Sequence, residues 1–323
     1  MALEILDYRY ITDWDFENLF SDTEFNEQIH PDFPLITATW SGSRPEATEK
    51  MWREYINGKK RGRPSDIIDS EYPSINTIST KAFGNNREVF NLRATCASSI
   101  YALYLAGLIS QDKQLPVVIF CADNKNTAFD YWQFSSLGAI DNGTGRPFDS
   151  SSKGLRMGTG GAVFIVKHSS VKSQLTAKAA VTNCHFYTNS NLATNPGPVD
   201  DLINNLSKIN YKSIDLWNAH ATGTPVGDRV EYDFFNRTIQ QDIPIVGFKG
   251  YIGHCMCAAG AIEIAMALDC KKQNNLLPNI IHSDKIVNDS RIITNSTSFS
   301  YKRMLKTSLG FGGICSAAEI DLW

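Results

Sequence analysis

One cysteine stands where its chemistry would be useful. Cys96 follows the β-branched and apolar run EVFNLRAT and precedes small residues that open a helix-like run at 98–109. Backbone N–H groups are free at the first turn of a helix, so this corner favours a thiolate and could also hold a substrate oxygen. The position suits a nucleophile that accepts an acyl group from a thioester. A buried structural cysteine fits this corner equally well.

Two histidines follow other strand-like runs. His220 ends SIDLWNAH and precedes a loop rich in Gly, Thr and Pro, and His254 lies between IPIVGF and the helix-like run at 258–272. In parallel α/β sheets, ligands bind beyond the carboxyl ends of the strands, which is where Cys96 and both histidines fall. One histidine at a strand end is more often structural, but two of the chain's six, both in Gly-rich loops of the same type, indicate a functional site.

A carboxylate in an apolar helix points to a buried ion pair. Glu263 lies in AAGAIEIAMAL, and if it is buried it needs a cation or several hydrogen bonds, for which Lys249 is a plausible partner. If Glu263 faces solvent, it needs no partner. The trio His254, Cys255 and Cys257 lacks a second Cys/His pair at zinc-finger spacing, so we expect no metal site.

The elements that position these residues alternate along the chain. Strand-like runs cover 34–40, 88–95, 116–122, 162–167, 179–187, 213–219 and 243–248. Helix-like runs cover 98–109, 199–209, 228–239 and 258–272. This alternation predicts an α/β architecture with largely parallel sheets. The Gly- and Ser-rich stretch 128–161 is interpreted as a surface loop, and the polar linker 168–178 divides the chain into two halves.

Composition excludes several classes of protein. The 323 residues are 42% apolar and 20% charged with a net charge of −3, which is ordinary for a globular chain and does not suggest nucleic acid or an anionic membrane as a partner. No apolar run approaches the ~20 residues of a membrane span, and the acidic, aromatic N-terminus does not resemble a signal peptide. Seven cysteines without regular spacing argue against a disulfide framework. We therefore expect a soluble cytoplasmic protein.

Five motifs in order resemble those of one family. ATCASS, RPFDSSSKGLRMGTGGAV, NAHATGTPVGD, KGYIGHCMCAAGAIE and SLGFGG are similar to motifs of the elongating β-ketoacyl synthases, the condensing enzymes of fatty acid and polyketide synthesis. The resemblance runs from about residue 34 to the end, with the first strand–helix portion reduced or replaced by 1–33. It implies an α/β thiolase-like fold of two pseudo-repeated βαβ-type halves, layered as an α-β-α-β-α sandwich. Residues 1–175 would carry Cys96, and residues 176–323 would carry the histidines.

The resemblance also implies a role for each residue of the reaction centre. Cys96 would be the acylated nucleophile. His220 and His254 would donate hydrogen bonds to the thioester carbonyl of a malonyl unit and stabilise the enolate formed when carbon dioxide leaves. Lys249 and Glu263 would form a supporting pair that positions His254.

Other residues would bind the substrate arm and guard the site. Thr222 and Thr224 correspond to hydroxyls that hold phosphopantetheine. Phe311 corresponds to the gatekeeping aromatic residue, and its backbone N–H would join that of Cys96 in an oxyanion hole. Ala221 stands where the family usually has glycine. No other cofactor is expected, because the substrates are carried on the phosphopantetheine of acyl carrier protein.

A short basic run suggests how the carrier protein would be recognised. Lys59, Lys60, Arg61 and Arg63 precede Cys96 where condensing enzymes present basic residues to acidic carrier proteins. A solvated loop is the common alternative, and a nucleic-acid site has weak support without interleaved aromatic residues. The family pairs the strand at 88–95 across a two-fold axis, so we expect a homodimer, with a heterodimer of homologous subunits as the alternative.

Two other functions stay open at this point. One is a ketosynthase-like acyltransferase that forms an ester or amide without decarboxylation. The other is a non-catalytic partner subunit that shapes the pocket of a catalytic homologue. The presence of Cys96, His220, His254 and Lys249 favours decarboxylative condensation over both.

Overall fold

The computed structural model describes residues 2–13, 15–40, 45–59, 65, 74–84, 87–123, 126–141, 145–188 and 197–323. The strands in these residues are β1 (Leu3–Ile11), β2 (Leu35–Ala38), β3 (Val89–Leu92), β4 (Val117–Asp123), β5 (Gly160–His168), β6 (Ala179–Thr188), β7 (Leu216–Asn218), β8 (Ile245–Val246), β9 (Arg303–Leu309) and β10 (Ile314–Leu322). The helices are α1 (Phe16–Leu19), α2 (Thr23–Glu27), α3 (Pro45–Ile56), α5 (Ser74–Phe83), α6 (Ser98–Lys113), α7 (Ala128–Ser136), α8 (Val199–Asn205), α9 (Pro225–Thr238), α10 (Lys249–Ile252) and α11 (Ala259–Lys272).

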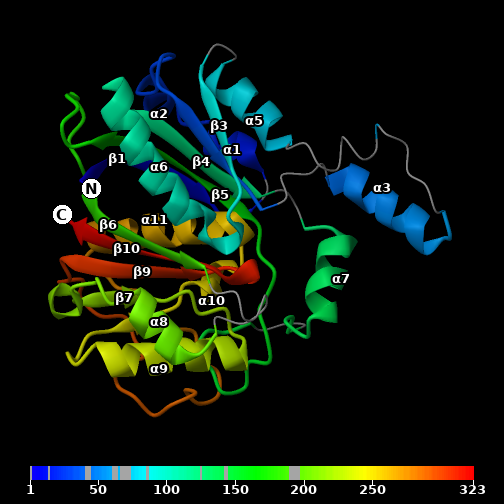
Figure 1. Ribbon diagram of the computed structural model, residues 1–323, viewed down its shortest axis with the longest axis vertical. Coiled ribbons are helices and arrows are strands. Elements are labelled where there is room, and N and C mark those ends of the chain that lie inside the picture. Colours follow the sequence, from blue (N-terminus) through cyan, green and yellow to red (C-terminus); the bar gives the residue numbers. More distant parts are fainter. Residues whose placement is uncertain are drawn as a thin grey trace.

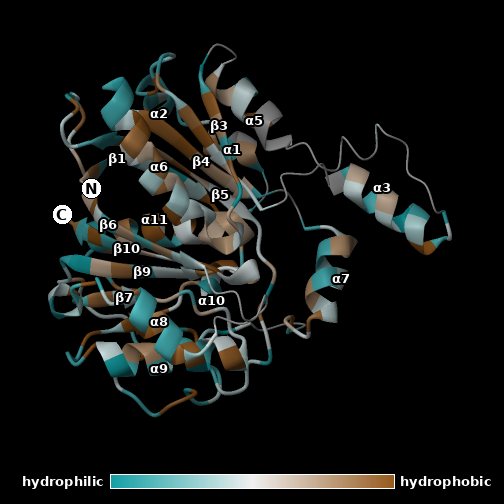
Figure 2. Cartoon of the chain, in the orientation of Figure 1, coloured by the Kyte–Doolittle hydropathy of each residue, from teal (hydrophilic) through white to brown (hydrophobic). Residues whose placement is uncertain are grey.

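Continuous apolar strands form because both of their faces are covered. Every residue of β4 is buried, and successive side chains point to opposite faces. Val117, Ile119 and Cys121 pack into one hydrophobic core, and Val118 and Phe120 pack into another. The apolar colour of β2, β4 and β5 in Figure 2 reflects this double burial.

The strands form one mixed sheet with a repeated order. The order is β3-β2-β4-β5-β1 followed by β6-β10-β9-β7-β8, so each strand of the first half has its counterpart five strands later in the chain, in mirrored order. β2 is parallel to β3 and β4, and β7 is parallel to β8 and β9. The five pairings between β4 and β9 are antiparallel. The expectation of largely parallel sheets is therefore correct only for the two outer parts.

Helices and sheet halves stack in five layers (Figure 1). Helices α6 and α11 lie in the centre, and their buried side chains share one core with strands of both halves. Helices α1, α2 and α5 cover the outer face of the first half, and α8 and α9 cover that of the second. The predicted α-β-α-β-α sandwich of the thiolase type is confirmed.

The two central helices begin in the same way. A 3-10 turn over Thr95–Ala97 leads into α6, and a second one over Met256–Ala258 leads into α11. Thr95 and Met256 at the start of these turns have φ of 51° and 45°, in the left-handed region that β-branched and bulky residues rarely adopt. The shared strain indicates that both turns are held in place by the packing around them.

Some elements differ from the sequence-based expectation. Residues 128–136, interpreted as loop, form α7, whose start carries a capping box between Thr127 and Asp130. Residues 1–33 include a first strand after all, because β1 lies at the middle of the sheet. The helices that follow it, α1 and α2, are short. In α6, the apolar side chains Tyr104 and Leu108 are exposed.

The division at 175/176 into two halves stays a prediction. β1 pairs with both β5 and β6, so the sheet runs without interruption across that boundary. No helix within the described residues is long and apolar enough to cross a membrane.

Candidate active site

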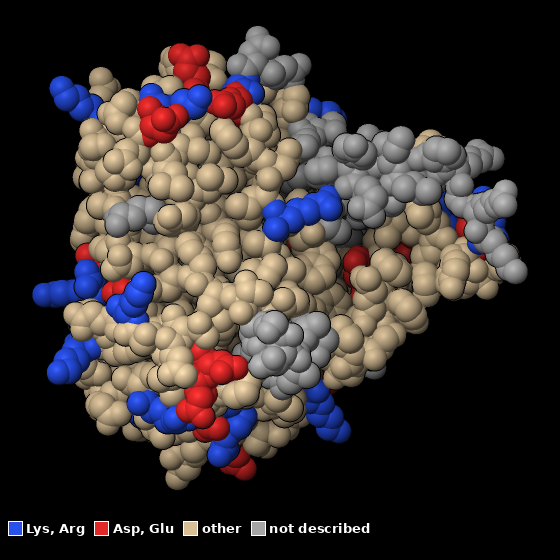
Figure 3. Space-filling view, viewed as in Figure 1, with Lys and Arg blue, Asp and Glu red and all other residues tan. Residues whose placement is uncertain are grey.

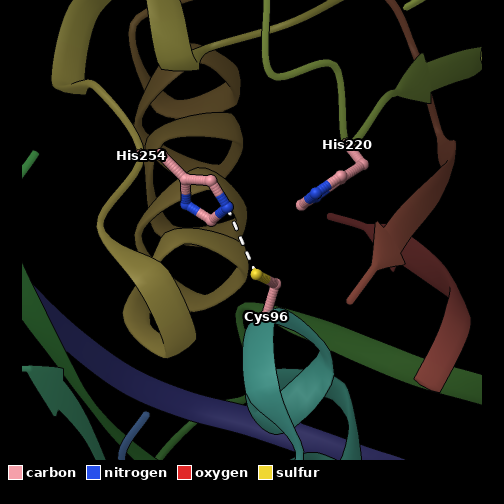
Figure 4. Close-up of side chains that lie close together, drawn as sticks. All are labelled: Cys96, His220 and His254. Atoms are coloured by element: carbon pink, nitrogen blue, oxygen red, sulfur yellow. Dashed lines mark hydrogen bonds between the residues drawn. The ribbon is translucent and has the colours of Figure 1, made fainter. Parts of the chain in front are cut away.

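Cys96, His220 and His254 meet in the interior of the molecule (Figure 4). The Sγ of Cys96 lies 3.2 Å from Nε2 of His254. The ring centroids of the two histidines are 5.4 Å apart, with an angle of 80° between the ring planes. The sulfur and one nitrogen from each ring all lie within 4.8 Å of one another. The structure thus brings the three predicted residues together around a space that one substrate atom could occupy.

Cys96, the predicted nucleophile, is presented by the turn between β3 and α6. Cys96 is the middle residue of the 3-10 turn, and its side chain is almost fully buried. Backbone hydrogen bonding from Phe311 and from Cys96 itself lowers the pKa of the Cys96 thiol. Thr95 Oγ1 donates a hydrogen bond to the carbonyl of Phe311 at 3.2 Å, which fastens the C-terminal loop beside the nucleophile. The oxyanion hole expected from these two amides stays a prediction.

His220 is held through its backbone at the end of β7. Its N–H donates to Glu231 Oε1 at 2.9 Å and to Thr307 Oγ1 at 3.1 Å, and the N–H of Ala221 donates to Glu231 Oε2. Its carbonyl accepts from Lys249 Nζ at 2.5 Å. Because both backbone groups are bound by buried side chains, the imidazole is presented from a rigid support.

His254 is held by the glycine-rich segment that follows the RPFD motif. Its N–H donates to the carbonyl of Arg156 at 2.7 Å, and its carbonyl accepts from the N–H of Gly158 at 3.0 Å. A Cβ on Gly158 would lie 2.2 Å from the carbonyl oxygen of Ile252, so only glycine permits this close approach. The motif between residues 146 and 163 therefore supports the second histidine directly.

A buried ion cluster lies behind the histidines. The Glu263 carboxylate accepts hydrogen bonds from Lys249 Nζ at 2.9 and 3.1 Å, and Lys306 Nζ lies 2.7 Å from its Oε2. All three side chains are at most 1% exposed. Glu263 thus faces the interior and pairs with Lys249 as expected. The backbone hydrogen bond from Lys249 goes to His220, however, and not to His254, which the pair was expected to position.

Burial sets the protonation states of the site. It lowers the pKa of His220 and His254 well below the usual value, and the positive charges of Lys249 and Lys306 lower both further. Burial also raises the pKa of Cys96 to about 12, an effect that Lys249 and the two backbone N–H groups oppose. The resting sulfur is therefore a thiol, not the thiolate that its position before a helix favours. The nearest base is the neutral imidazole of His254.

A pocket of about 310 Å³ leads to the sulfur. Thr222 and Thr224 line it, and their hydroxyl oxygens are 3.0 Å apart. Phe311 also lines it, with its ring packed against Phe134 and Trp40. The predicted arm-binding and gating residues therefore all border the space in front of the nucleophile.

The remaining predicted sites are placed only in part. Of the basic run, Lys59 is described and lies 2.6 Å from Glu54, whereas Lys60, Arg61 and Arg63 lie outside the described residues. Cys257 Sγ points to the carbonyl of Ala38 rather than to His254. Within the described part of the chain, Cys96, His220 and His254 form the one group of ligand atoms spaced closely enough to hold a metal ion.

Sequence reasoning missed the charged residues that support the histidines. Both Glu231 and Lys306 are buried. Glu231 accepts a hydrogen bond from the backbone N–H of His220, and Lys306 pairs with Glu263 in the ion cluster. The signal was present, because Lys306 interrupts the apolar strand MLKTSL just as Glu263 interrupts an apolar helix. Asp123, which accepts from Thr39, Trp40 and Cys257 at the end of β4, gave no comparable signal.

Comparison with known proteins agrees with this geometry. Residues 176–284 match the family model of the C-terminal domain of β-ketoacyl synthases. The chain is 26% identical over 212 residues to a non-reducing polyketide synthase from Aspergillus terreus, a match that covers 61% of this chain and 8% of that protein.

Solved structures share the fold over most of the chain. A β-ketoacyl synthase from Burkholderia phymatum gives a TM-score of 0.78 at 20% identity, covering 94% of this chain and 78% of that one. A ketosynthase solved in complex with its type II acyl-carrier protein gives 0.77 at 20% identity, covering 92% and 80%. Residues 176–284 therefore resemble the C-terminal domain of β-ketoacyl synthases, and the whole chain shares the fold of solved ketosynthases.

Proposed function

We propose that this chain catalyses decarboxylative Claisen condensation of the 3-oxoacyl-carrier-protein synthase type, in polyketide or fatty acid biosynthesis. An acyl group would be transferred to Cys96 and joined to a malonyl thioester on acyl carrier protein. The observation that carries the proposal is the contact between Cys96 Sγ and His254 Nε2 at 3.2 Å, with a second neutral imidazole beside it.

In the first half-reaction, Cys96 accepts the acyl group. The thiol proton passes to Nε2 of His254 as the sulfur attacks the acyl thioester. The new S–C bond forms, the bond to the carrier thiol breaks, and the departing thiolate takes the proton. The N–H groups of Cys96 and Phe311, both of which lower the pKa of the thiol, would hold the tetrahedral oxyanion.

In the second half-reaction, the malonyl unit loses carbon dioxide. The electron pair of the broken C–C bond moves onto the thioester oxygen. His220 donates a ring N–H to this enolate, and His254 donates a second one after its ring proton has exchanged from Nδ1 to Nε2. The enolate carbon then attacks the acyl group on Cys96. A C–C bond forms, the S–C bond breaks, and the Cys96 thiolate that is released takes a proton from water.

The substrates would arrive on acyl carrier protein. A similar structure is a ketosynthase bound to such a protein, and the 310 Å³ pocket lined by Thr222 and Thr224 suits the entry of a phosphopantetheine arm. The basic run Lys59, Lys60, Arg61 and Arg63 would attract the acidic carrier protein.

A two-fold dimer would form through β3 and α6. β3 is an edge strand, and Val89, Tyr104 and Leu108 are 38–46% exposed along this face. Figure 3 shows few charged side chains over α6, whereas the upper and lower ends of the same face carry both signs. An edge strand beside an uncharged helix face suits pairing with a second subunit. That subunit would be a copy of this chain or a homologue, as in the ketosynthase solved with its chain length factor.

Acyl loading tests the nucleophile. Wild-type protein incubated with acetyl- or hexanoyl-carrier protein should gain the mass of the acyl group, and Cys96→Ala should not. Cys121→Ala is the matched control, since Cys121 is equally buried but lies in β4. Equal gains in wild type and Cys96→Ala would exclude Cys96 as the nucleophile.

Product mass separates the rival functions. With malonyl-carrier protein added, condensation lengthens the acyl chain by two carbons, whereas transfer to an ester or amide adds none. A non-catalytic subunit would not be loaded at all.

A further inference from the structure

Lys306 is a buried cation to which the reaction above gives no role. It lies in the middle of β9 with 0% exposure, and its Nζ is 2.7 Å from Glu263 Oε2 and 3.3 Å from the carbonyl oxygen of Ala219. A buried ammonium is costly unless it is paired, so the position is a specific one.

Two ammonium groups share one carboxylate and reach two consecutive carbonyls. Lys249 and Lys306 both contact Glu263. Lys249 donates to the carbonyl of His220, and Lys306 donates to the carbonyl of Ala219. The two peptides on either side of His220 are therefore held, one from β9 and the other from α10.

The N–H side of the same peptides is held by acceptors. Glu231 accepts from His220 and Ala221, and Thr307, the neighbour of Lys306, accepts from His220 and donates to Glu231. Two lysines and two glutamates thus surround this backbone, so their formal charges balance only if Lys306 is counted.

We propose that Lys306 is a positioning residue of the active site, which acts with Lys249 through Glu263 to hold the backbone of His220. The inference rests on the function proposed for His220 and His254. Lys306 contacts no reacting atom, so its removal should change rate and pH dependence more than substrate binding.

The expected pH effect has a defined sign. Glu263 from α11, Lys249 from α10 and Glu231 from α9 are the charged groups that act on Lys306. The Lys306 charge lowers the pKa of His220 and His254. Removing it should raise both, so activity should begin to fall at a higher pH as the solution is acidified.

Three variants test the proposal. Lys306→Met removes the charge and the donor, and Lys306→Gln removes the charge but keeps a donor for Ala219. Lys167→Met is the matched control, because Lys167 is similarly buried on β5 and pairs with Glu4 at 2.5 Å, away from the site. The readouts are carbon dioxide release from malonyl-carrier protein, and titration of the imidazole ring signals by NMR, assigned with His220→Asn and His254→Asn.

Lys306→Met should lower kcat about tenfold near neutral pH while KM changes less than about twofold. Its buried imidazoles should titrate at higher pH than in wild type. Lys306→Gln should show the same titration shift with a smaller loss of kcat, and it carries the test alone if the methionine variant does not fold. Lys167→Met should match wild type in both readouts.

Two results would overturn the inference. One is an unchanged imidazole titration in both Lys306 variants, and the other is a Lys167→Met variant that reproduces their changes. If wild-type protein released no carbon dioxide, the proposed function would fail, but the NMR titration would still decide the role of Lys306.

Discussion

At the scale of single residues, the site combines a protonated thiol of raised pKa with an adjacent base. Burial raises the pKa of Cys96 to about 12, and it holds His254 neutral at 3.2 Å from the sulfur. The thiol proton can therefore leave during attack rather than before it. In the proposed reaction, this arrangement would keep the sulfur in its thiol form until a thioester enters the pocket.

Alkylation of Cys96 by iodoacetamide should reflect this burial. The rate, measured by peptide mass spectrometry, should be low at pH 7 and should still be rising above pH 9, where an exposed cysteine with a pKa of ~8.5 has levelled off. The sign follows from the raised pKa, since the thiolate fraction keeps growing until the pH approaches it. A rate that is already constant at pH 7 would mean that a thiolate is formed in the resting protein.

Some residues of the site could be predicted from the sequence, and others could not. Cys96, His220, His254, Lys249 and Glu263 could be predicted because each interrupts a recognisable pattern within a family motif. The second partner of Glu263 could not be predicted. It is Lys306, 43 positions further along, and only the fold brings β9 beside α11. A burial argument from sequence can state that a charge needs a partner without saying which one.

At the scale of elements, the loop over 310–313 packs closely against the 3-10 turn over Thr95–Ala97 that carries Cys96. Thr95 Oγ1 is bound to the carbonyl of Phe311, and a Cβ on Gly310 would lie 2.1 Å from that hydroxyl oxygen and 2.8 Å from the carbonyl oxygen of Ile314. The loop over 310–313 can approach Cys96 only because residue 310 has no side chain.

Gly310→Ala should therefore move the Phe311 N–H away from the oxyanion position. We expect acyl loading of Cys96 to slow by about 10- to 100-fold and the free energy of unfolding to fall by about 1–3 kcal/mol. Loading is followed by intact mass and stability by denaturant titration. The double variant with Thr95→Ala should recover part of the loading rate. A fully active single variant, or no recovery in the double variant, would contradict this role of the turn.

Strands were predicted correctly where burial on both faces requires a continuous run of apolar residues. The apolar runs of β4 and β5 exist because both faces of these strands are buried, so they were visible in the sequence. β10, with the sequence ICSAAEIDL, was missed because small residues and a buried glutamate occupy a strand between two others. The left-handed Thr95 has no sequence signal, because its conformation is imposed by the surrounding packing.

At the scale of the whole molecule, the repeated sheet explains why the site forms. The two halves place α6 and α11 side by side in the central layer, with a similar 3-10 turn at the start of each. Cys96 and His254 are 158 positions apart in sequence, yet they meet where these two turns converge. The family motifs predicted the sandwich, but periodicity alone predicted parallel sheets and missed the antiparallel centre.

The central claim is that two imidazoles act on one malonyl thioester beside an acylated cysteine. Its most direct test is the release of labelled carbon dioxide from malonyl-carrier protein, measured together with acyl loading in wild type and His220→Ala. We predict that His220→Ala loads Cys96 at a rate close to wild type and releases carbon dioxide about 10²- to 10³-fold more slowly. Release at the wild-type rate in this variant would contradict the account.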